Sequence, residues 1–179
     1  SVSFGFDESS KGCILLKEKL EVEIEKAING GYKNFISGMA LGVDLWAAEI
    51  VLRLKEKYPD IELYCAIPYK AQSTNWSQAY RERYMTCIHR CKKYQVISPF
   101  YAKDCYFKRN MYMVDRSSLV IGVCIEMFAV FTMYDIPIKA KYDLKFNKII
   151  NKRIVIKSVK SEYSWAGNNG DSRIGKFFP

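Results

Sequence analysis

The sequence has few of the features that mark membrane, secreted or disulfide-rich proteins. It holds no apolar run of about eighteen residues, so we expect no membrane span and no membrane partner. It opens without a basic, apolar leader, so we expect no secretory signal and a cytoplasmic location. Its six cysteines follow no framework spacing, and without an export signal we expect them to be reduced.

Residues that usually carry metal or nucleophilic chemistry are also scarce. The single histidine, His89, lies between Cys87 and Cys91, and on a helix it would point away from both. There is no nucleophile elbow and no cluster of metal-binding carboxylates. Glu49 could be a general base or a solvated carboxylate, and we favour the latter. The sequence therefore predicts no metal site and no cofactor, and favours a binding module over an enzyme.

The composition indicates a folded domain with a basic surplus. Of the 179 residues, 49% are hydrophobic, enough to bury a full core, and the formal net charge is +9. Basic residues are densest between Lys139 and Lys160, where Asp143 is the one acidic residue. A basic balance attracts polyanions, so single-stranded nucleic acid is a candidate partner. The alternative is a lysine-rich surface of the kind common in AT-rich genomes, and we favour it.

Apolar periodicity predicts helices that alternate with strands. The expected helices cover residues 11–29, 41–58, 75–91 and 107–117. The expected strands cover 32–37, 61–67, 94–98 and 119–124, with a last edge strand at 149–157. This alternation predicts a mostly parallel sheet with helices on both faces, a Rossmann-like α/β fold. We expect a single domain over 1–157 and a flexible tail over 158–179.

The stretch from Ser37 to Asp44 is the most informative. It joins a buried strand to a helix through Gly38-Met39-Ala40-Leu41-Gly42, so the amides of Met39 to Gly42 could point at a phosphate. Asp44 lies in the first turn, where it could cap an amide or hold a sugar hydroxyl. The alternative is a simple strand-to-helix turn. The loop is neither a dinucleotide fingerprint nor a P-loop.

Two further groups follow other strands. Pro68 and Tyr69 end the strand at 61–67 in the run Ile67-Pro68-Tyr69-Lys70-Ala71-Gln72, and Tyr69 or Trp76 could stack on a base. Trp76 could equally anchor the third helix in the core. Arg109 and Asn110 suit a phosphate or carboxylate. Asp115 could pair with Arg109 or hold a hydroxyl, and a structural salt bridge is the alternative.

Three ordered blocks carry a resemblance to a known family. They are Ser37–Glu49, then Ala66-Ile67-Pro68-Tyr69, then Arg109-Asn110 with Tyr112-Met113-Val114-Asp115. They resemble the YpsA-like branch of the SLOG superfamily, which also holds the DNA-processing protein DprA and the LOG cytokinin-activating phosphoribohydrolases. The match covers about residues 4–124. It implies a Rossmann-like fold and a nucleotide-like ligand, with Arg109, Asn110 and Asp115 opposite the loop.

The chain departs from that family pattern in two places. Members usually begin with a strand and a Thr-Gly-His-Arg-like motif, whereas this sequence starts after that point. Members also carry a Gly-Gly-Thr turn after the strand equivalent to 119–124, whereas Cys124 to Thr132 holds no glycine. We therefore expect a Rossmann-like domain whose first strand is missing and whose C-terminal part is atypical.

These observations favour a module that binds or senses a nucleotide or nucleotide derivative. One alternative is a DprA-like protein that binds single-stranded DNA through basic residues and tyrosines. Another is a LOG-like nucleoside monophosphate phosphoribohydrolase, although the Pro-Gly-Gly-x-Gly-Thr-x-x-Glu motif of those enzymes is absent. An exposed sheet edge would also make the chain a candidate homo-oligomer.

Overall fold

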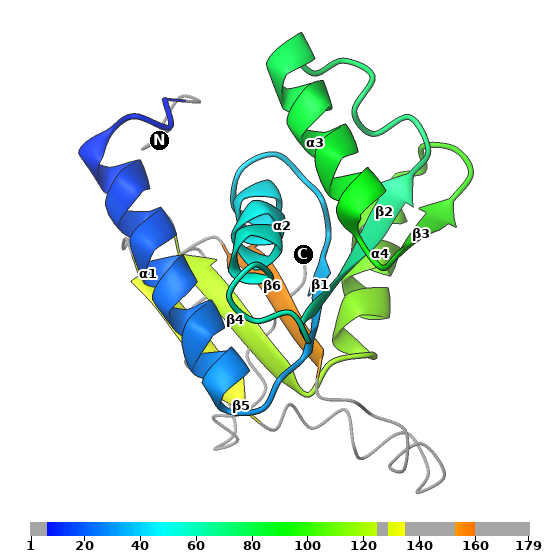
Figure 1. The fold of residues 1–179 in the computed structure, drawn as a ribbon. Helices are drawn as coiled ribbons and strands as arrows, with labels where there is room; N and C mark the ends of the chain where they lie inside the picture. The colour runs from blue at the N-terminus through cyan, green and yellow to red at the C-terminus, as the bar shows by residue number, and fades with distance from the viewer. Residues whose placement is uncertain (1–6, 125–128, 135–152, 160–179) are drawn as a thin grey trace, which may run out of the picture.

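Helices and strands alternate in the computed structural model, which describes residues 7–124, 129–134 and 153–159 (Figure 1). In chain order the elements are α1 (Lys11–Asn29), β1 (Asn34–Ser37), α2 (Val43–Leu54), β2 (Glu62–Tyr69), α3 (Gln78–Arg90), β3 (Lys93–Ser98), α4 (Cys105–Val114), β4 (Leu119–Cys124), β5 (Ala129–Tyr134) and β6 (Arg153–Val159). The predicted Rossmann-like α/β class is confirmed.

Local signals set the ends of the helices. Helix α1 begins after Ser10, whose hydroxyl caps the amide of Cys13, and it ends at Gly30, as predicted. Helix α2 is shorter than expected. It starts after Gly42 and ends at Leu54, because hydrogen-bonded turns occupy the residues up to Tyr58. Among the described residues, no helix is both long and apolar enough to cross a bilayer.

The sheet has the strand order β3-β2-β1-β6-β4-β5. All neighbouring strands are parallel except β4 and β5. Strand β6 pairs on both sides, with Ser37 of β1 opposite Ile156 and Leu119 of β4 opposite Ile154. The predicted edge position of this segment is therefore wrong. The run Ile154-Val155-Ile156 suits an interior strand, because interior parallel strands are buried on both faces.

The C-terminal part also differs from the pattern that the family resemblance implies. A helix would be expected to open after β4, but the described residues there form β5, antiparallel to β4. The expected loss of a core strand leaves no gap in the sheet of described residues, because β6 fills its interior. The flexible tail predicted from residue 158 lies outside the described residues from 160 onward, and β6 itself reaches Val159.

The helices cover the two faces of the sheet unequally. Helices α1, α2 and α3 form one layer, and α4 lies against the other face (Figure 1). Side chains alternate between two cores as strands require: Phe35 packs with the three-helix layer, whereas Ile36, Ala66 and Val120 pack with Met113 of α4. Segments on opposite faces can therefore meet only around the ends of the strands.

The strand order places a topological switch at β1. From β1 the chain moves outward through α2, β2, α3 and β3, then crosses by α4 to β4 on the other side of β1. Ligands of open α/β sheets bind outside the carboxyl ends of the strands at such a point. The loop after Ser37 lies at this position.

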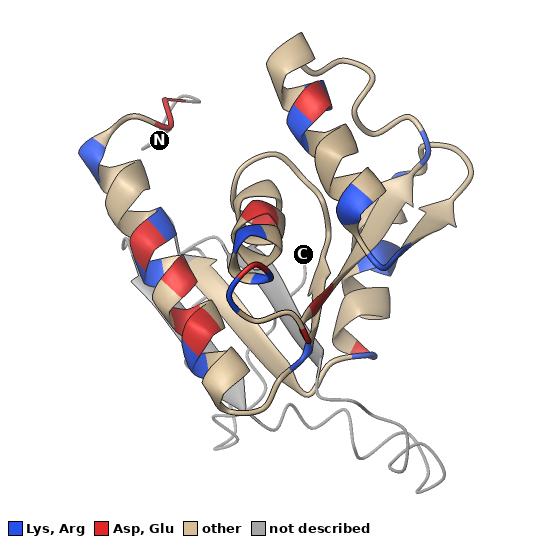
Figure 2. Ribbon diagram, in the orientation of Figure 1, with Lys and Arg blue, Asp and Glu red and all other residues tan. Residues whose placement is uncertain are grey.

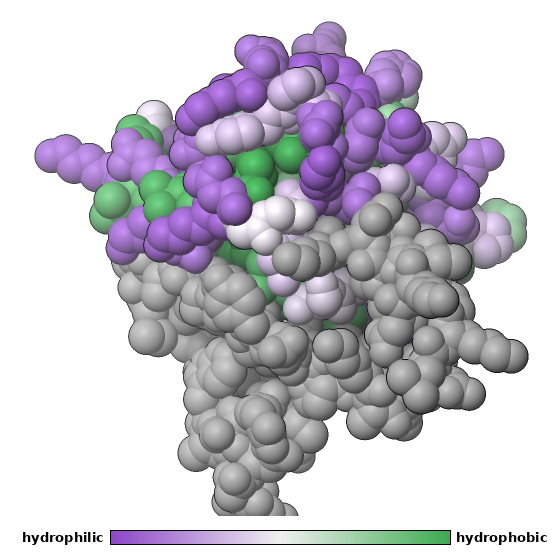
Figure 3. Space-filling model, turned by 60° about the horizontal axis from the view of Figure 1, so that its bottom comes forward, coloured by the Kyte–Doolittle hydropathy of each residue, from purple (hydrophilic) through white to green (hydrophobic). Residues whose placement is uncertain are grey.

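Charge is mixed over the described part of the molecule. Residues 7–124 hold 18 Lys or Arg and 14 Asp or Glu, so they carry +4 of the total +9. Figure 2 shows both signs interleaved along α1. Figure 3 shows a face on which hydrophilic side chains dominate the described surface and apolar residues form small groups. More than half of the basic surplus thus belongs to the rest of the chain.

Candidate functional site at the carboxyl end of β1

The loop between β1 and α2 turns through two residues with left-handed backbone conformations. They are Met39, with φ of 57°, and Gly42, with φ of 85°. Gly42 immediately precedes the first residue of α2. The predicted strand, glycine turn and helix start are therefore all present.

The loop satisfies part of its own hydrogen bonding. The Ser37 hydroxyl donates to the Asp44 carbonyl at 2.7 Å and accepts from the Met39 amide at 3.2 Å. The Asp44 carboxylate accepts from the Ala40 amide at 3.2 Å. Two of the amides that we expected to face an anion are therefore occupied by the loop itself.

Other amides of the loop are unpaired in the described structure, and we call them open amides. Among the described residues, the amides of Leu41, Gly42, Val43 and Asp44 have no acceptor, whereas Leu45 donates to the Ala40 carbonyl. These are the orphan donors of a helix N-terminus, which carries a partial positive charge. The unpaired amides thus lie nearer to Gly42 than to Gly38.

Arg109 of α4 reaches around the strand ends to this loop. Its Nη1 donates to the Gly38 carbonyl and to Asp44 Oδ2, the latter at 2.9 Å. The side chains of Arg109 and Asp44 are 7% and 8% exposed, so this is a buried ion pair between opposite layers. It neutralises the carboxylate that would otherwise repel a phosphate beside it.

The two glycines of the loop have different roles. A Cβ at Gly38 would overlap Arg109 Nη1 and lie 2.7 Å from Asp44 Oδ2. A Cβ at Gly42 would have nothing within 4 Å. Gly38 therefore makes room for the guanidinium, and Gly42 borders open space.

Buried polar atoms without a partner among the described residues occur on Gln72 and Arg109, which contact the loop, and on Asn110, which follows Arg109 in α4. Gln72 is 5% exposed, and its Nε2 donates to the Met39 carbonyl. Gln72 Oε1, Arg109 Nε and Asn110 Oδ1 are buried and have no partner among the described residues. Such atoms are costly and uncommon in folded proteins. Gln72 was not among the predicted site residues, and only its position after a strand end could have suggested it.

An aromatic cluster lies on the α4 side of the same edge. Tyr69 makes edge-on contacts with Tyr101 and Tyr106, at ring separations of 5.4 and 6.1 Å. The guanidinium of Arg109 is 6.0 Å from the Tyr106 ring. Burial, together with the hydrogen bond to Tyr69, raises the pKa of Tyr106 to about 12. Tyr69 is thus near the site, with two tyrosines that the sequence did not single out.

The remaining predicted residues are placed differently. Pro68 is buried within β2, and Trp76 packs edge-on against Tyr84 at 5.4 Å beside the main core. Asp115 is exposed at the C-terminal end of α4, where the chain turns back toward the start of β4. The structure therefore pairs Arg109 with Asp44 and does not bring Asp115 to it.

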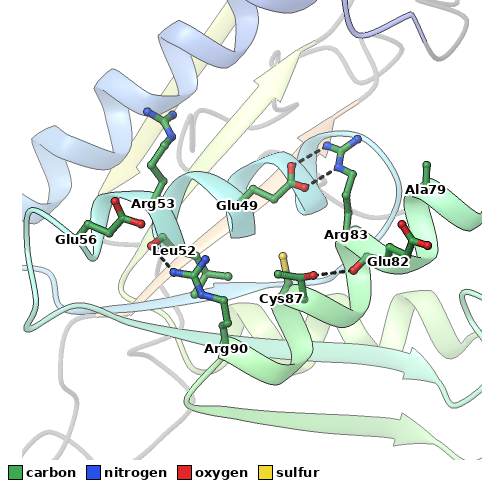
Figure 4. Close-up of a pocket in the computed structure, with 10 residues that line it drawn as sticks. Glu49, Leu52, Arg53, Glu56, Ala79, Glu82, Arg83, Cys87 and Arg90 are labelled. Carbon is green, nitrogen blue, oxygen red and sulfur yellow. Dashed lines mark hydrogen bonds and ion pairs between the residues drawn. The ribbon is translucent and has the colours of Figure 1, made fainter.

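A separate cleft of about 600 Å³ lies between α2 and α3 (Figure 4). Charged side chains of both signs line it, and Arg83 of α3 holds both carboxylate oxygens of Glu49, at 2.6 and 2.7 Å. Glu49 is therefore paired, not freely solvated as we favoured. The cleft contains none of the predicted binding residues. Among the described residues, no group of three His, Cys, Asp or Glu side chains could hold a metal ion.

Arg83 also binds Glu8, at 2.8 and 3.2 Å, and Lys17 binds Glu8 at 2.5 Å. Arg83 thereby joins the residues before α1 to α2 and α3. Burial opposes the ionisation of Glu8, but hydrogen bonds from Arg83 and Lys17 outweigh it and lower the pKa of Glu8 from 4.5 to about 2.

The strands and helices define a Rossmann-like α/β domain with a glycine-containing loop at its topological switch point. Consistent with this class, residues 2–153 match the YpsA family, described as the YspA SLOG family. The chain therefore belongs to the YpsA branch of the SLOG proteins.

Curated relatives support the assignment. The chain is 35% identical over 115 residues to the UPF0398 protein ABC2016 of Shouchella clausii, covering 63% of this chain and 61% of that protein. It is 30% identical over 114 residues to the UPF0398 protein BH1768 of Halalkalibacterium halodurans, covering 63% and 60%. The matched segment thus spans about three fifths of the length of these relatives.

The different roles of the two glycines predict different stabilities. Gly38→Ala should displace Arg109 and leave Asp44 buried without its partner, at a cost of about 3–5 kcal/mol. Gly42→Ala should lower the unfolding free energy only by the strain of alanine at a positive φ, about 1–3 kcal/mol. Urea unfolding of the two variants checks this. Equal stabilities, or a more stable Gly38→Ala, would contradict the assigned role of Gly38.

The lowered pKa of Glu8 predicts acid sensitivity. Ionised Glu8 stabilises the fold above its unfolded pKa, and this contribution should be lost as the pH falls from about 5 to 2. Glu8→Gln should lower the unfolding free energy at pH 7 by about 2 kcal/mol. Between about pH 5 and 2 the unfolding free energy of this variant should decrease less than that of the wild type. Glu18→Gln, at an exposed position of α1, is the matched control. Parallel pH profiles for wild type and Glu8→Gln would rule this out.

Proposed function

We propose that this chain binds a nucleotide or nucleotide derivative, with a phosphate at the N-terminus of α2. The observation that carries the proposal is the set of open amides from Leu41 to Asp44 beside the unobstructed face of Gly42. Backbone amides at a helix N-terminus bind anions through hydrogen bonds and the helix dipole. The switch-point position of the loop and the SLOG resemblance favour the same class of ligand.

The surroundings of the loop also suit such a ligand. Arg109 neutralises Asp44, so the carboxylate beside the amides does not oppose an anion. Tyr69, Tyr101 and Tyr106 supply aromatic rings at the same edge of the sheet, where a base could stack. We therefore propose that the phosphate binds at α2 and the base lies toward these tyrosines.

We propose binding or sensing as the role, because the described site holds no free acid or base beside the open amides. Glu49 is paired with Arg83, and Asp44 with Arg109. The phosphoribohydrolase and single-stranded DNA functions are the competing proposals. A phosphoribohydrolase would release a free base, and a DNA-binding protein would form a complex with an oligonucleotide. One protein sample can be tested for both.

Thermal denaturation with a panel of nucleoside mono- and diphosphates and nucleotide sugars tests the proposal. A bound nucleotide at 100 times its Kd should stabilise the chain by about 2.7 kcal/mol, a rise in Tm of about 5–10 °C. Gly42→Asp should abolish the rise, because a carboxylate would face the open amides. Gly31→Asp is the matched control, since Gly31 has a φ of 86° at the C-terminal end of α1.

The panel also decides between the alternatives. Absence of any shift, or an equal shift in Gly42→Asp, overturns the proposal. Salt-sensitive binding of a labelled oligonucleotide without nucleotide binding would favour the DNA function. Release of free base from a nucleoside monophosphate would favour the hydrolase.

A further inference from the structure

Gln72 has a fixed orientation and an unused acceptor. Its side chain lies against the loop, where Nε2 donates to the Met39 carbonyl. A carbonyl can only accept, so this bond determines which end of the amide faces the loop. Oε1 is then left buried and without a partner among the described residues, although Gln72 is 5% exposed.

The polar side chains of the loop itself are already committed. The Ser37 hydroxyl both donates and accepts within the loop. The Asp44 carboxylate, which we expected to hold a sugar hydroxyl, binds the Ala40 amide and Arg109 instead. Gln72 Oε1 is thus an orphan buried acceptor on a side chain that contacts the loop, and Asn110 Oδ1 is a second buried acceptor without a partner among the described residues.

We propose that Gln72 Oε1 accepts a hydrogen bond from a ribose hydroxyl, which makes the ligand a ribonucleotide. This inference rests on the proposed function. A phosphate at the open amides of α2 puts the attached sugar next to the loop, and its hydroxyls are the nearest donors that a nucleotide offers. A neutral amide suits this position because, unlike a carboxylate, it does not repel the phosphate.

The chemistry also explains why an unpaired acceptor is tolerated. A buried acceptor without a partner carries a desolvation penalty, which a ligand hydroxyl would relieve on binding. A ligand without that hydroxyl would leave the penalty in place. Sites built to bond a hydroxyl reject analogues that lack it for this reason. Gln72 is therefore a specificity-determining residue, distinct from the amides that hold the phosphate.

Calorimetric titration of the full chain with AMP, 2′-deoxy-AMP, 3′-deoxy-AMP and inorganic phosphate tests the inference. GMP, CMP and UMP, each with its deoxy analogue, replace the adenine nucleotides if another base is preferred. The wild type should bind the ribonucleotide at least about tenfold more tightly than one of its deoxy analogues. Gln72→Met keeps the length of the side chain and removes the acceptor, so the preference should fall below about threefold.

A loosened loop would weaken ribo and deoxy ligands equally, so the ratio of their affinities separates specificity from a structural role. Gln95→Met, at an exposed position of β3, should keep the wild-type ratio. Equal affinities in the wild type, a ratio unchanged in Gln72→Met, or discrimination that follows the amino groups of the base would overturn the inference and leave the proposed function standing. Failure of every nucleotide to bind would overturn both.

Discussion

The buried ion pair between Asp44 and Arg109 is the interaction on which the candidate site depends. It joins the start of α2 on one face of the sheet to α4 on the other, across the carboxyl end of β1. Burying two charges costs several kcal/mol per ion, which their attraction and further hydrogen bonds must offset. The pair is therefore better understood as a device that fixes geometry than as a source of stability. It sets where the loop lies relative to both helical layers.

This geometry decides which groups remain for a ligand. Arg109 occupies the space above Gly38, and Asp44 takes up the Ala40 amide, so the first half of the loop is closed. The second half, around Gly42, keeps its amides. Asp44 neutralises the Arg109 guanidinium that contacts the loop, so the helix terminus is the source of positive potential that these contacts leave. This arrangement is the basis on which we propose a ligand that combines one anionic group with neutral hydroxyls.

Most of the fold and part of the site could be predicted from the sequence. The ends of α1 and the strand–loop–helix unit at Ser37 follow from local caps, glycines and apolar spacing. The partner of Arg109 does not, because Asp44 is 65 residues away and only the crossover of α4 brings the two together. The sequence offered Asp115 instead, which is near in the chain but at the far end of the helix. The interior position of β6 could not be predicted for the same reason, because its partners β1 and β4 are distant in the sequence.

That interior position bears directly on the loop. Strand β1 has only four residues, so its place depends on its two neighbours, with Ser37 opposite Cys65 of β2 and Ile156 of β6. Strand β2 is joined to β1 through the short α2 unit, whereas β6 comes from more than 100 residues along the chain. Closing so long a loop is entropically costly, so the place of β1 depends on a pairing that forms only at long range along the chain. The geometry of the loop therefore rests on a distant segment as well as on its own glycines.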